Sequence, residues 1–137
     1  MTVLLVDAAN VVGSRPDGWW RDRAGATARL LSRLAMLPGR TVAGPDGEPV
    51  RVTDVVVVVE GQARGVPHPE GVRLVRAPGS GDDALAGTAA ALAGDDDLLV
   101  VTADRGLRTR LPGTARIAGP GWLLAALDRA GLEESGG

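Results

Sequence analysis

The sequence predicts a layered α/β domain built on a mostly parallel β-sheet. Three short and uninterrupted apolar runs, at residues 3–6, 55–59 and 98–101, are typical of strands that are buried on both faces of such a sheet. Stretches with helical spacing of apolar residues separate these runs, and this alternation favours parallel strands. The length of 137 residues suffices for one core, so we expect residues 1–137 to form a single domain.

The first helix is predicted over residues 24–37, after the strand at 3–6. Its apolar face repeats at helical spacing through Thr27, Leu30, Leu31, Leu34 and Leu37. We expect this helix to begin near Asp17, with the tryptophan pair at 19–20 in its first turn. The Pro-Gly pair at 38–39 should end it.

A small hairpin is predicted next, over residues 41–53, because a Pro-Asp-Gly turn at 45–47 separates two short apolar segments. The hairpin leads into the second apolar strand. After that strand, residues 61–71 are too rich in proline and glycine for a helix, so we expect a loop there. A weaker strand pattern follows at 72–75.

Two more helices complete the pattern, over residues 82–93 and 121–130, with a weak strand at 115–118 between them. Ser80 precedes the first of these helices. We interpret it as a helix cap rather than a nucleophile, since no histidine base lies near it in the motif. The tail at 133–137 is expected to be frayed.

The composition excludes several kinds of chemistry. The chain has no cysteine, which excludes disulfides, thiol nucleophiles, zinc ribbons and iron–sulfur ligation. All fifteen basic residues are arginine, so a Walker-type phosphate loop and a Schiff-base lysine are excluded too. His68 is the only histidine, and we expect it to lie exposed in a loop without a role. Catalysis must therefore rely on carboxylates, arginine, hydroxyls and the backbone.

Charge and hydropathy point to a soluble, cytoplasmic protein. The first apolar run is too short for a signal peptide, and no run approaches the ~20 apolar residues of a membrane span. A net charge of −2 argues against a protein that coats nucleic acid by bulk charge, although a local arginine patch remains compatible with it.

Acidic residues stand where each apolar strand ends. Asp7, Glu60 and Asp104 lie at or just past three separate strands, and Asp82 and Asp83 open a helix. If the first strand is central, these side chains converge at the carboxyl edge of the sheet, where open parallel sheets bind ligands. Clustered carboxylates repel unless a cation neutralises them, and Mg²⁺ or Mn²⁺ prefers such oxygen ligands. The alternative is that each acid merely caps a helix or complements its dipole.

The order and spacing of these motifs resemble the PIN-like nuclease superfamily, and within it the NYN-domain branch. The matching segments are Val-Asp-Ala-Ala-Asn at 6–10, Glu60, Gly-Asp-Asp-Ala-Leu at 81–85 and Val-Thr-Ala-Asp-Arg-Gly-Leu at 101–107. The resemblance covers the chain from residue 3 to about residue 124. It implies a three-layer α/β/α sandwich with a mostly parallel sheet, and metal-dependent ribonuclease activity.

The resemblance also implies roles for individual residues. Asp7, Asp82 and Asp104 would be the catalytic acids that hold Mg²⁺ or Mn²⁺, with Asp83 auxiliary. Asn10 would orient Asp7 or contact a phosphate. Glu60 departs from the branch, which more often has aspartate at this point. We keep Glu60 in the metal set because its longer side chain can still reach an ion, directly or through water.

Arginines that follow the strands supply a predicted surface for the substrate. Arginine suits bidentate contacts with phosphate, and an exposed tryptophan at 19–20 could stack on a base. The alternative is a solvated helix face with tryptophans packed against the sheet. The residues assigned to substrate binding are Asn10, Arg15, Arg21, Arg23, Thr102, Arg105 and Arg108.

The function that we predict from these features is metal-dependent endonucleolytic hydrolysis of single-stranded RNA. One alternative is a nucleotide phosphohydrolase or pyrophosphohydrolase that uses the same metal site, which a closed pocket would favour over an open groove. Another is a catalytically silent RNA-binding module. The expected partner is single-stranded RNA, with no membrane, and a homodimer is left open.

Overall fold

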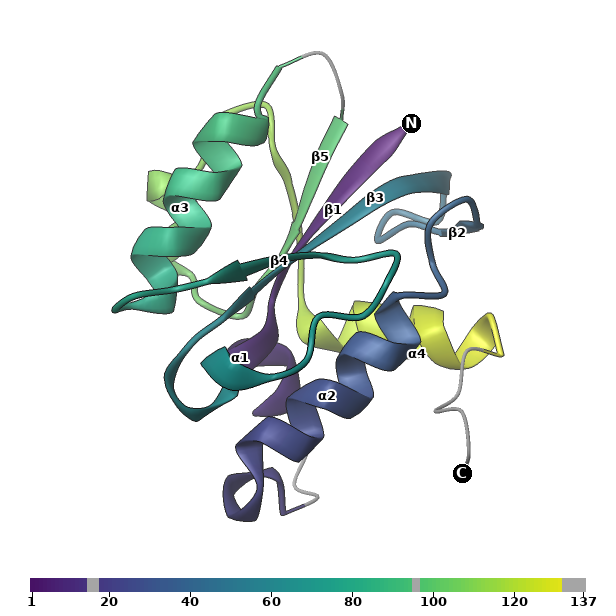
Figure 1. The fold of residues 1–137 in the computed structure, drawn as a ribbon. Helices are drawn as coiled ribbons and strands as arrows, with labels where there is room; N and C mark the ends of the chain where they lie inside the picture. Colours follow the sequence, from purple (N-terminus) through teal and green to yellow (C-terminus); the bar gives the residue numbers. More distant parts are fainter. Residues whose placement is uncertain (15–17, 95–96, 132–137) are drawn as a thin grey trace.

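A computed structural model describes residues 1–14, 18–94 and 97–131. Their strands form one six-stranded sheet. Strand β1 (Thr2–Asp7) lies at its centre (Figure 1). It pairs in parallel with β3 (Pro49–Val59) on one side and with β5 (Asp97–Val101) on the other. A central first strand is the arrangement that lets the acids at the strand ends converge.

The remaining strands extend the sheet outwards on both sides. Strand β6 (Arg116–Ala118) pairs in parallel with β5, and β4 (Arg73–Arg76) pairs in parallel with the second half of β3. The short β2 (Thr41–Ala43) runs antiparallel to the start of β3, which confirms the predicted hairpin. The chain moves from β1 to β3 and β4 on one side, and only then to β5 and β6 on the other. The strand order therefore reverses at β1, and ligands bind at such a reversal.

Helices cover both faces of the sheet, which confirms the three-layer α/β/α sandwich. Helices α1 (Ala8–Val12), α2 (Arg23–Leu34) and α4 (Pro120–Arg129) pack on one face. Helix α3 (Gly81–Leu92) packs on the other, together with the 3₁₀ turn η3 (Gly106–Arg110), and Figure 1 shows α3 standing apart from α2 and α4.

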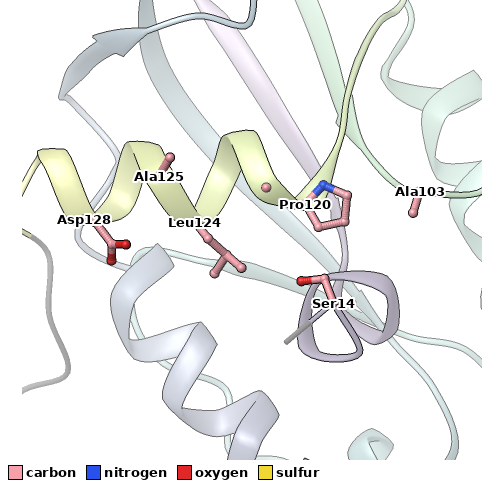
Figure 2. Close-up of a pocket in the computed structure, with 7 residues that line it drawn as sticks. Ser14, Ala103, Pro120, Leu124, Ala125 and Asp128 are labelled. Atoms are coloured by element: carbon pink, nitrogen blue, oxygen red, sulfur yellow. The ribbon is translucent and has the colours of Figure 1, made fainter. Parts of the chain in front are cut away.

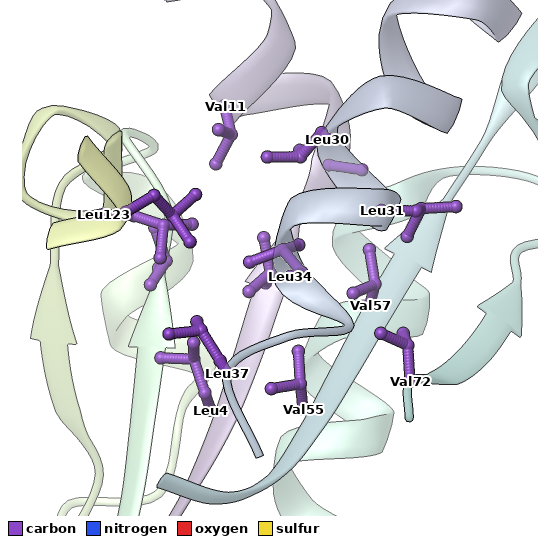
Figure 3. Close-up of a cluster of buried hydrophobic side chains, with 14 of the residues drawn as sticks. Leu4, Val11, Leu30, Leu31, Leu34, Leu37, Val55, Val57, Val72 and Leu123 are labelled. Atoms are coloured by element: carbon purple, nitrogen blue, oxygen red, sulfur yellow. The ribbon is translucent and has the colours of Figure 1, made fainter. Parts of the chain in front are cut away.

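The central strands send alternate side chains into two separate cores. Leu4 and Val6 point towards α1, α2 and α4, in the larger core shown in Figure 3. Val3 and Leu5 point towards α3. This two-sided burial explains why the strands read as unbroken apolar runs. Each buried side chain of this size contributes about 1.5–3 kcal/mol to folding.

The predicted start of the first long helix was wrong. Helix α2 begins at Arg23 because Asp22 caps it, with Oδ1 accepting the Gly25 N–H at 2.9 Å. The segment Trp19–Arg21 forms a separate 3₁₀ turn, η1, and Asp17 lies outside the described residues. The helix also ends earlier than predicted, at Leu34, although Leu37 is still buried.

Other element boundaries follow the predictions closely. Helices α3 and α4 each begin one residue before the predicted start, and the Ser80 hydroxyl accepts the Asp82 N–H at 3.2 Å, which confirms its role as a cap. The loop predicted at 61–71 contains a short 3₁₀ turn, η2 (Gly61–Gly65). The tail at 133–137 lies outside the described residues. Within the described part of the chain, no helix is long and apolar enough to cross a membrane.

Candidate active site at the carboxyl edge of the sheet

Asp7 is the buried centre of the candidate site. It ends β1, caps the short helix α1, and is 4% exposed. Its Oδ2 accepts hydrogen bonds from Asn10 Nδ2 at 2.5 Å and from Thr102 Oγ1 at 3.3 Å. Burial raises the pKa of Asp7; the hydrogen bonds from Asn10 and Thr102 oppose this rise, and the charge of Glu60 adds to it. A buried carboxylate with a raised pKa carries negative charge that its surroundings do not fully compensate.

Asn10 and Thr102 tie the end of β1 to the loop after β5. Asn10 Oδ1 accepts the Ala103 N–H at 3.2 Å, and Thr102 Oγ1 accepts the Asp104 N–H, also at 3.2 Å. The contact of Asn10 with Asp7 suits a residue that orients this acid. Thr102 is buried and bonded to Asp7, which places its hydroxyl beneath the site instead of on its surface.

Asp82, Asp104 and Glu60 are half-buried and form the rim of the site. Partial burial raises the pKa of Asp82, and the negative charges of Asp104 and Glu60 raise it further. Asp104 is oriented by its own loop, since its Oδ1 accepts the N–H groups of Gly106 at 2.9 Å and Leu107 at 3.3 Å. The structure thus connects four acids from four different segments: the charge of Glu60 acts on Asp7 and on Asp82, and the charge of Asp104 acts on Asp82.

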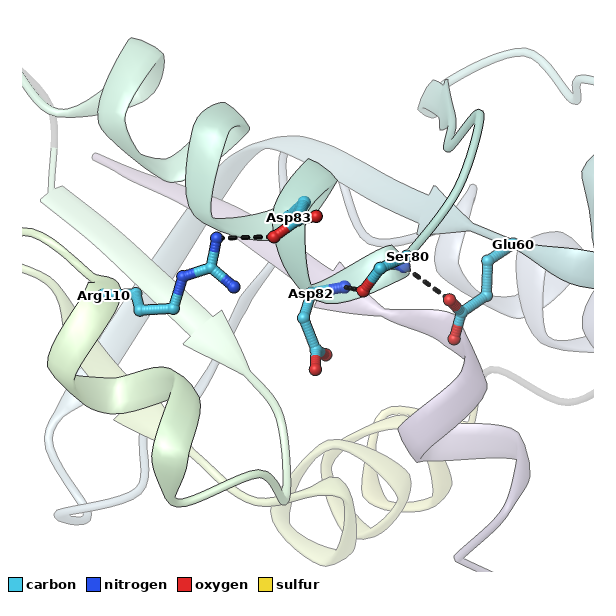
Figure 4. A network of polar contacts seen from close by, with 6 residues as sticks. Glu60, Ser80, Asp82, Asp83 and Arg110 are labelled. Atoms are coloured by element: carbon cyan, nitrogen blue, oxygen red, sulfur yellow. Dashed lines mark hydrogen bonds and ion pairs between the residues drawn. The ribbon is translucent and has the colours of Figure 1, made fainter.

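Glu60 fastens the start of α3 to the end of β3. Its Oε2 accepts the Gly81 N–H at 2.5 Å, in the network that Figure 4 shows. The approach is close enough that a Cβ on Gly81 would lie 2.6 Å from this oxygen. A glycine at the first position of α3 is therefore what lets the carboxylate reach the helix N-terminus, where a negative charge is favourable.

Asp83 faces away from the other acids, although it is next to Asp82 in the chain. Its Oδ1 pairs with the Arg110 guanidinium at 2.7 Å, and its side chain is 73% exposed (Figure 4). The structure does not bring Asp83 into the group formed by Asp7, Glu60, Asp82 and Asp104.

The Glu60–Gly81 contact makes two glycines of α3 respond oppositely to the same substitution. Gly87→Ala should stabilise the protein by about 1 kcal/mol, because its Cβ meets open space and alanine favours a helix. Gly81→Ala should destabilise it by about 1 kcal/mol, because the methyl group displaces the Glu60 carboxylate from its hydrogen bond. Urea unfolding measures both.

In a Glu60→Ala background, Gly81→Ala should lose its penalty, since residues in contact are not additive. A penalty that persists in this background would show that Gly81 is needed for a reason other than Glu60.

The donor set of the site fits a hard divalent cation. Its side chains offer carboxylate, amide and hydroxyl oxygens, the ligands that Mg²⁺ and Mn²⁺ prefer. Burial, and after it the negative charge of neighbouring acids, raises the pKa of both Asp7 and Asp82. In the part of the chain that the structure describes, no three acidic side chains are already close enough to hold one ion. Binding an ion would therefore require the carboxylates to draw together.

The structure describes four of the five arginines that the sequence assigns to substrate binding. Arg21, Arg23, Arg105 and Arg108 are exposed, and the Arg21 guanidinium lies 6.0 Å from the ring centroid of the exposed Trp20. Arg15 lies outside the described residues.

One cavity adjoins Glu60, a second has Ala103, the neighbour of Asp104, in its wall, and neither could be predicted from the sequence. The first, of ≈ 370 Å³, lies between α1 and α2, with Arg23 in its wall. The other, of ≈ 410 Å³, lies between α4 and the residues after α1, with Ser14 and Leu124 in its wall (Figure 2). Their walls consist largely of small and apolar residues, which carry no chemical pattern that a sequence motif could reveal.

The fold and the site together define an α/β/α sandwich with an acidic site at the end of its central strand. Among solved structures, the chain is similar to a crystal structure of Rae1 (YacP) from Bacillus subtilis, determined for a tryptophan-to-leucine mutant, with a TM-score of 0.66. The identity is 21%, and the match covers 94% of this chain and 76% of the Rae1 chain. This similarity concerns the fold. Comparisons with family models and with curated proteins find no match.

Proposed function

We propose that this protein is a divalent-metal-dependent endoribonuclease that hydrolyses phosphodiester bonds of single-stranded RNA. The observation that carries the proposal is the convergence of Asp7, Glu60, Asp82 and Asp104 at the point where the strand order reverses. The resemblance of the motifs to PIN-like nucleases, together with the Rae1-like fold, favours this activity over others that an acidic site could perform.

In this proposal, Asp7, Asp82 and Asp104 hold Mg²⁺ or Mn²⁺. When bound, the ion supplies Lewis-acid activation of the phosphodiester and lowers the pKa of a water molecule. Asn10 and Thr102 fix the carboxylate of Asp7 through their hydrogen bonds. Glu60 contributes charge at the border of the site while it holds the start of α3.

The substrate side of the proposal rests on the exposed arginines. Arg105 follows Asp104 directly in the chain, Arg108 follows it by four residues, and both are exposed, so we expect their guanidinium groups to contact phosphates near the acids. Arg23 lines the cavity beside Glu60, and Arg21 lies two residues before it in the chain. RNA that crosses the acids would then meet positive charge from both segments, despite the net charge of −2.

One observation favours a second candidate, a nucleotide phosphohydrolase. The cavity of ≈ 370 Å³ beside Glu60 is within the size range of small-molecule sites. A nucleotide held there would present its phosphates to the same acids, so the choice between RNA and nucleotide must come from the products.

The deciding experiment incubates the purified protein with end-labelled single-stranded RNA and, separately, with nucleoside triphosphates. Each reaction contains Mn²⁺, Mg²⁺ or EDTA. We expect internal cleavage of the RNA with either metal and none with EDTA. Hydrolysed nucleotides beside intact RNA would support the phosphohydrolase, and RNA that is bound but never cleaved would support a silent binding module.

Arg105→Gln should weaken RNA binding and reduce its dependence on salt. Removing one arginine–phosphate interaction should flatten the slope of log affinity against log salt by about 0.7 for a single strand. Fluorescence anisotropy in EDTA measures this slope without cleavage. Arg51→Gln is the matched control, because Arg51 is exposed near the opposite end of β3. Equal salt-dependence slopes for Arg105→Gln and Arg51→Gln would mean that RNA does not bind at Arg105.

A further inference from the structure

The cavity beside Glu60 has the composition of a site for a small aromatic group. It opens between α1, α2 and the turn after β3, and its volume is ≈ 370 Å³. Its apolar walls come from α1 and from that turn, in the form of Ala9, Val12 and Ala63. Ligand sites are typically lined by such apolar groups, with a few polar atoms that fix orientation.

The polar groups of this cavity suit a nucleobase with an attached phosphate. Glu60 has two carboxylate oxygens, of which Oε2 accepts the Gly81 N–H. Oε1 remains as an acceptor for the N–H groups of a base. Arg23 adds positive charge at the wall on the α2 side, and the hydroxyl-bearing Thr27 lies one helical turn further along α2.

The cavity lies next to the acids, because Glu60 is in its wall and two other wall residues are close in the chain to Asp7 and Asp82. Glu60 lines the cavity, and its charge raises the pKa of both Asp7 and Asp82. Ala9 follows Asp7 by two residues, and Gly79 precedes Asp82 by three. A base in the cavity therefore has its own sugar–phosphate within the neighbourhood of the carboxylates.

We propose that this cavity binds one base of single-stranded RNA, the base of the nucleotide next to the phosphate that is cleaved. This inference rests on the proposed ribonuclease function. The base lies between the apolar walls, its N–H edge faces Glu60, and the cavity sets which phosphate reaches Asp7, Asp82 and Asp104.

A cavity-filling variant tests this assignment. Gly79 lines the cavity and a Cβ on it meets no atom within 4 Å, so Gly79→Leu adds a large side chain at the wall of the cavity. Gly113→Leu is the matched control, because Gly113 is an exposed loop glycine with the same open space and lies before β6. Ala9→Leu fills the cavity from α1 and serves as a second variant if Gly79→Leu does not fold.

The probe is a series of short RNA oligonucleotides, each with one abasic nucleotide at a different position. Binding is measured by anisotropy in EDTA. For the wild type, we expect the abasic change to weaken binding about tenfold at one position, because the base then no longer buries apolar surface against the walls of the cavity. Gly79→Leu should weaken binding of the intact RNA by a similar factor and remove the abasic penalty at that position. Gly113→Leu should behave as wild type.

Two results would overturn the inference. If Gly79→Leu and Ala9→Leu keep the wild-type abasic penalty while RNA is still cleaved with Mn²⁺, the cavity does not hold a base and the ribonuclease proposal stands. If the wild type neither binds nor cleaves RNA, the proposed function fails and this assignment fails with it.

Discussion

Asp7→Asn is expected to lower metal-dependent RNA hydrolysis by on the order of 10³-fold or more. Asp7 is the one acid of the group that ends the central strand, and it is held from two sides by Asn10 and Thr102. An asparagine has the same shape but cannot supply the negative charge that a divalent ion requires. The assay is cleavage of end-labelled RNA with Mn²⁺, at equal protein concentration.

The loss should not reflect unfolding. Burial raises the pKa of Asp7 above its value in the unfolded chain, so its ionised form costs stability as the pH rises past the unfolded pKa of about 3.9. A neutral asparagine avoids this cost at pH 7. Part of the gain is lost, because the new amide faces groups that donate to Asp7 in the wild type. We therefore expect a melting temperature at pH 7 close to that of the wild type.

Asp54→Asn is the matched control, because Asp54 is an exposed acid on the same sheet, in the first half of β3. It should keep full activity. If purified Asp7→Asn retains hydrolysis after contaminating nuclease has been excluded, Asp7 does not hold the metal and the proposed site is wrong.

The layers and the position of the site could be predicted from the sequence because both depend on local patterns. Strands that are buried on two faces must be apolar throughout, so β1, β3 and β5 can be predicted from continuous apolar segments of the sequence. The convergence of Asp7, Glu60 and Asp104 then follows from a general rule of parallel sheets, once β1 is central.

Features that depend on specific capping residues were harder to predict. Helix α1 has only five residues and begins immediately after β1, so no periodicity could separate it from the strand. Helix α2 begins at Arg23 because the Asp22 side chain reaches the Gly25 N–H. An acid five residues earlier, Asp17, is an equally good cap by residue type.

Contacts between distant segments have no local pattern at all. Asp82 and Asp83 are identical neighbours in the sequence, yet one faces Asp104 and the other pairs with Arg110, 27 residues away. Glu60 likewise meets a backbone N–H 21 residues along the chain. Only the packing of α3 and η3 on one face of the sheet determines these partners.

The two adjacent acids of α3 should respond to neutralisation with opposite sign. Partial burial and the charges of Asp104 and Glu60 raise the pKa of Asp82 in the folded protein. A raised folded pKa means that the stability contribution is intact below the unfolded pKa of about 3.9 and is lost as the pH rises through the folded pKa. At pH 7 in EDTA, Asp82→Asn should therefore raise the melting temperature by about 2–4 °C, or about 1 kcal/mol or less after solvent screening. At pH 4 or below the gain should fade.

Asp83→Asn is the matched control on the same helical turn. It loses an exposed ion pair with Arg110 and a favourable charge at the helix N-terminus, so its melting temperature should fall slightly. If the helix dipole dominated at Asp82 as well, both variants would melt lower in EDTA, and the repulsion between Asp82 and Asp104 would not govern this site.

Manganese should reverse the order of Asp82→Asn and the wild type. An ion that binds only the folded state at 100 times its Kd stabilises it by about 2.7 kcal/mol, which exceeds the cost of the clustered charges. The wild type should thus gain several degrees with Mn²⁺, whereas Asp82→Asn, with one ligand fewer, should gain little. Asp83→Asn should gain as much as the wild type if Asp83 is outside the metal set, as its pairing with Arg110 indicates. If Mn²⁺ does not change the melting temperature of the wild type, Asp82 acts only as a charge at the N-terminus of α3.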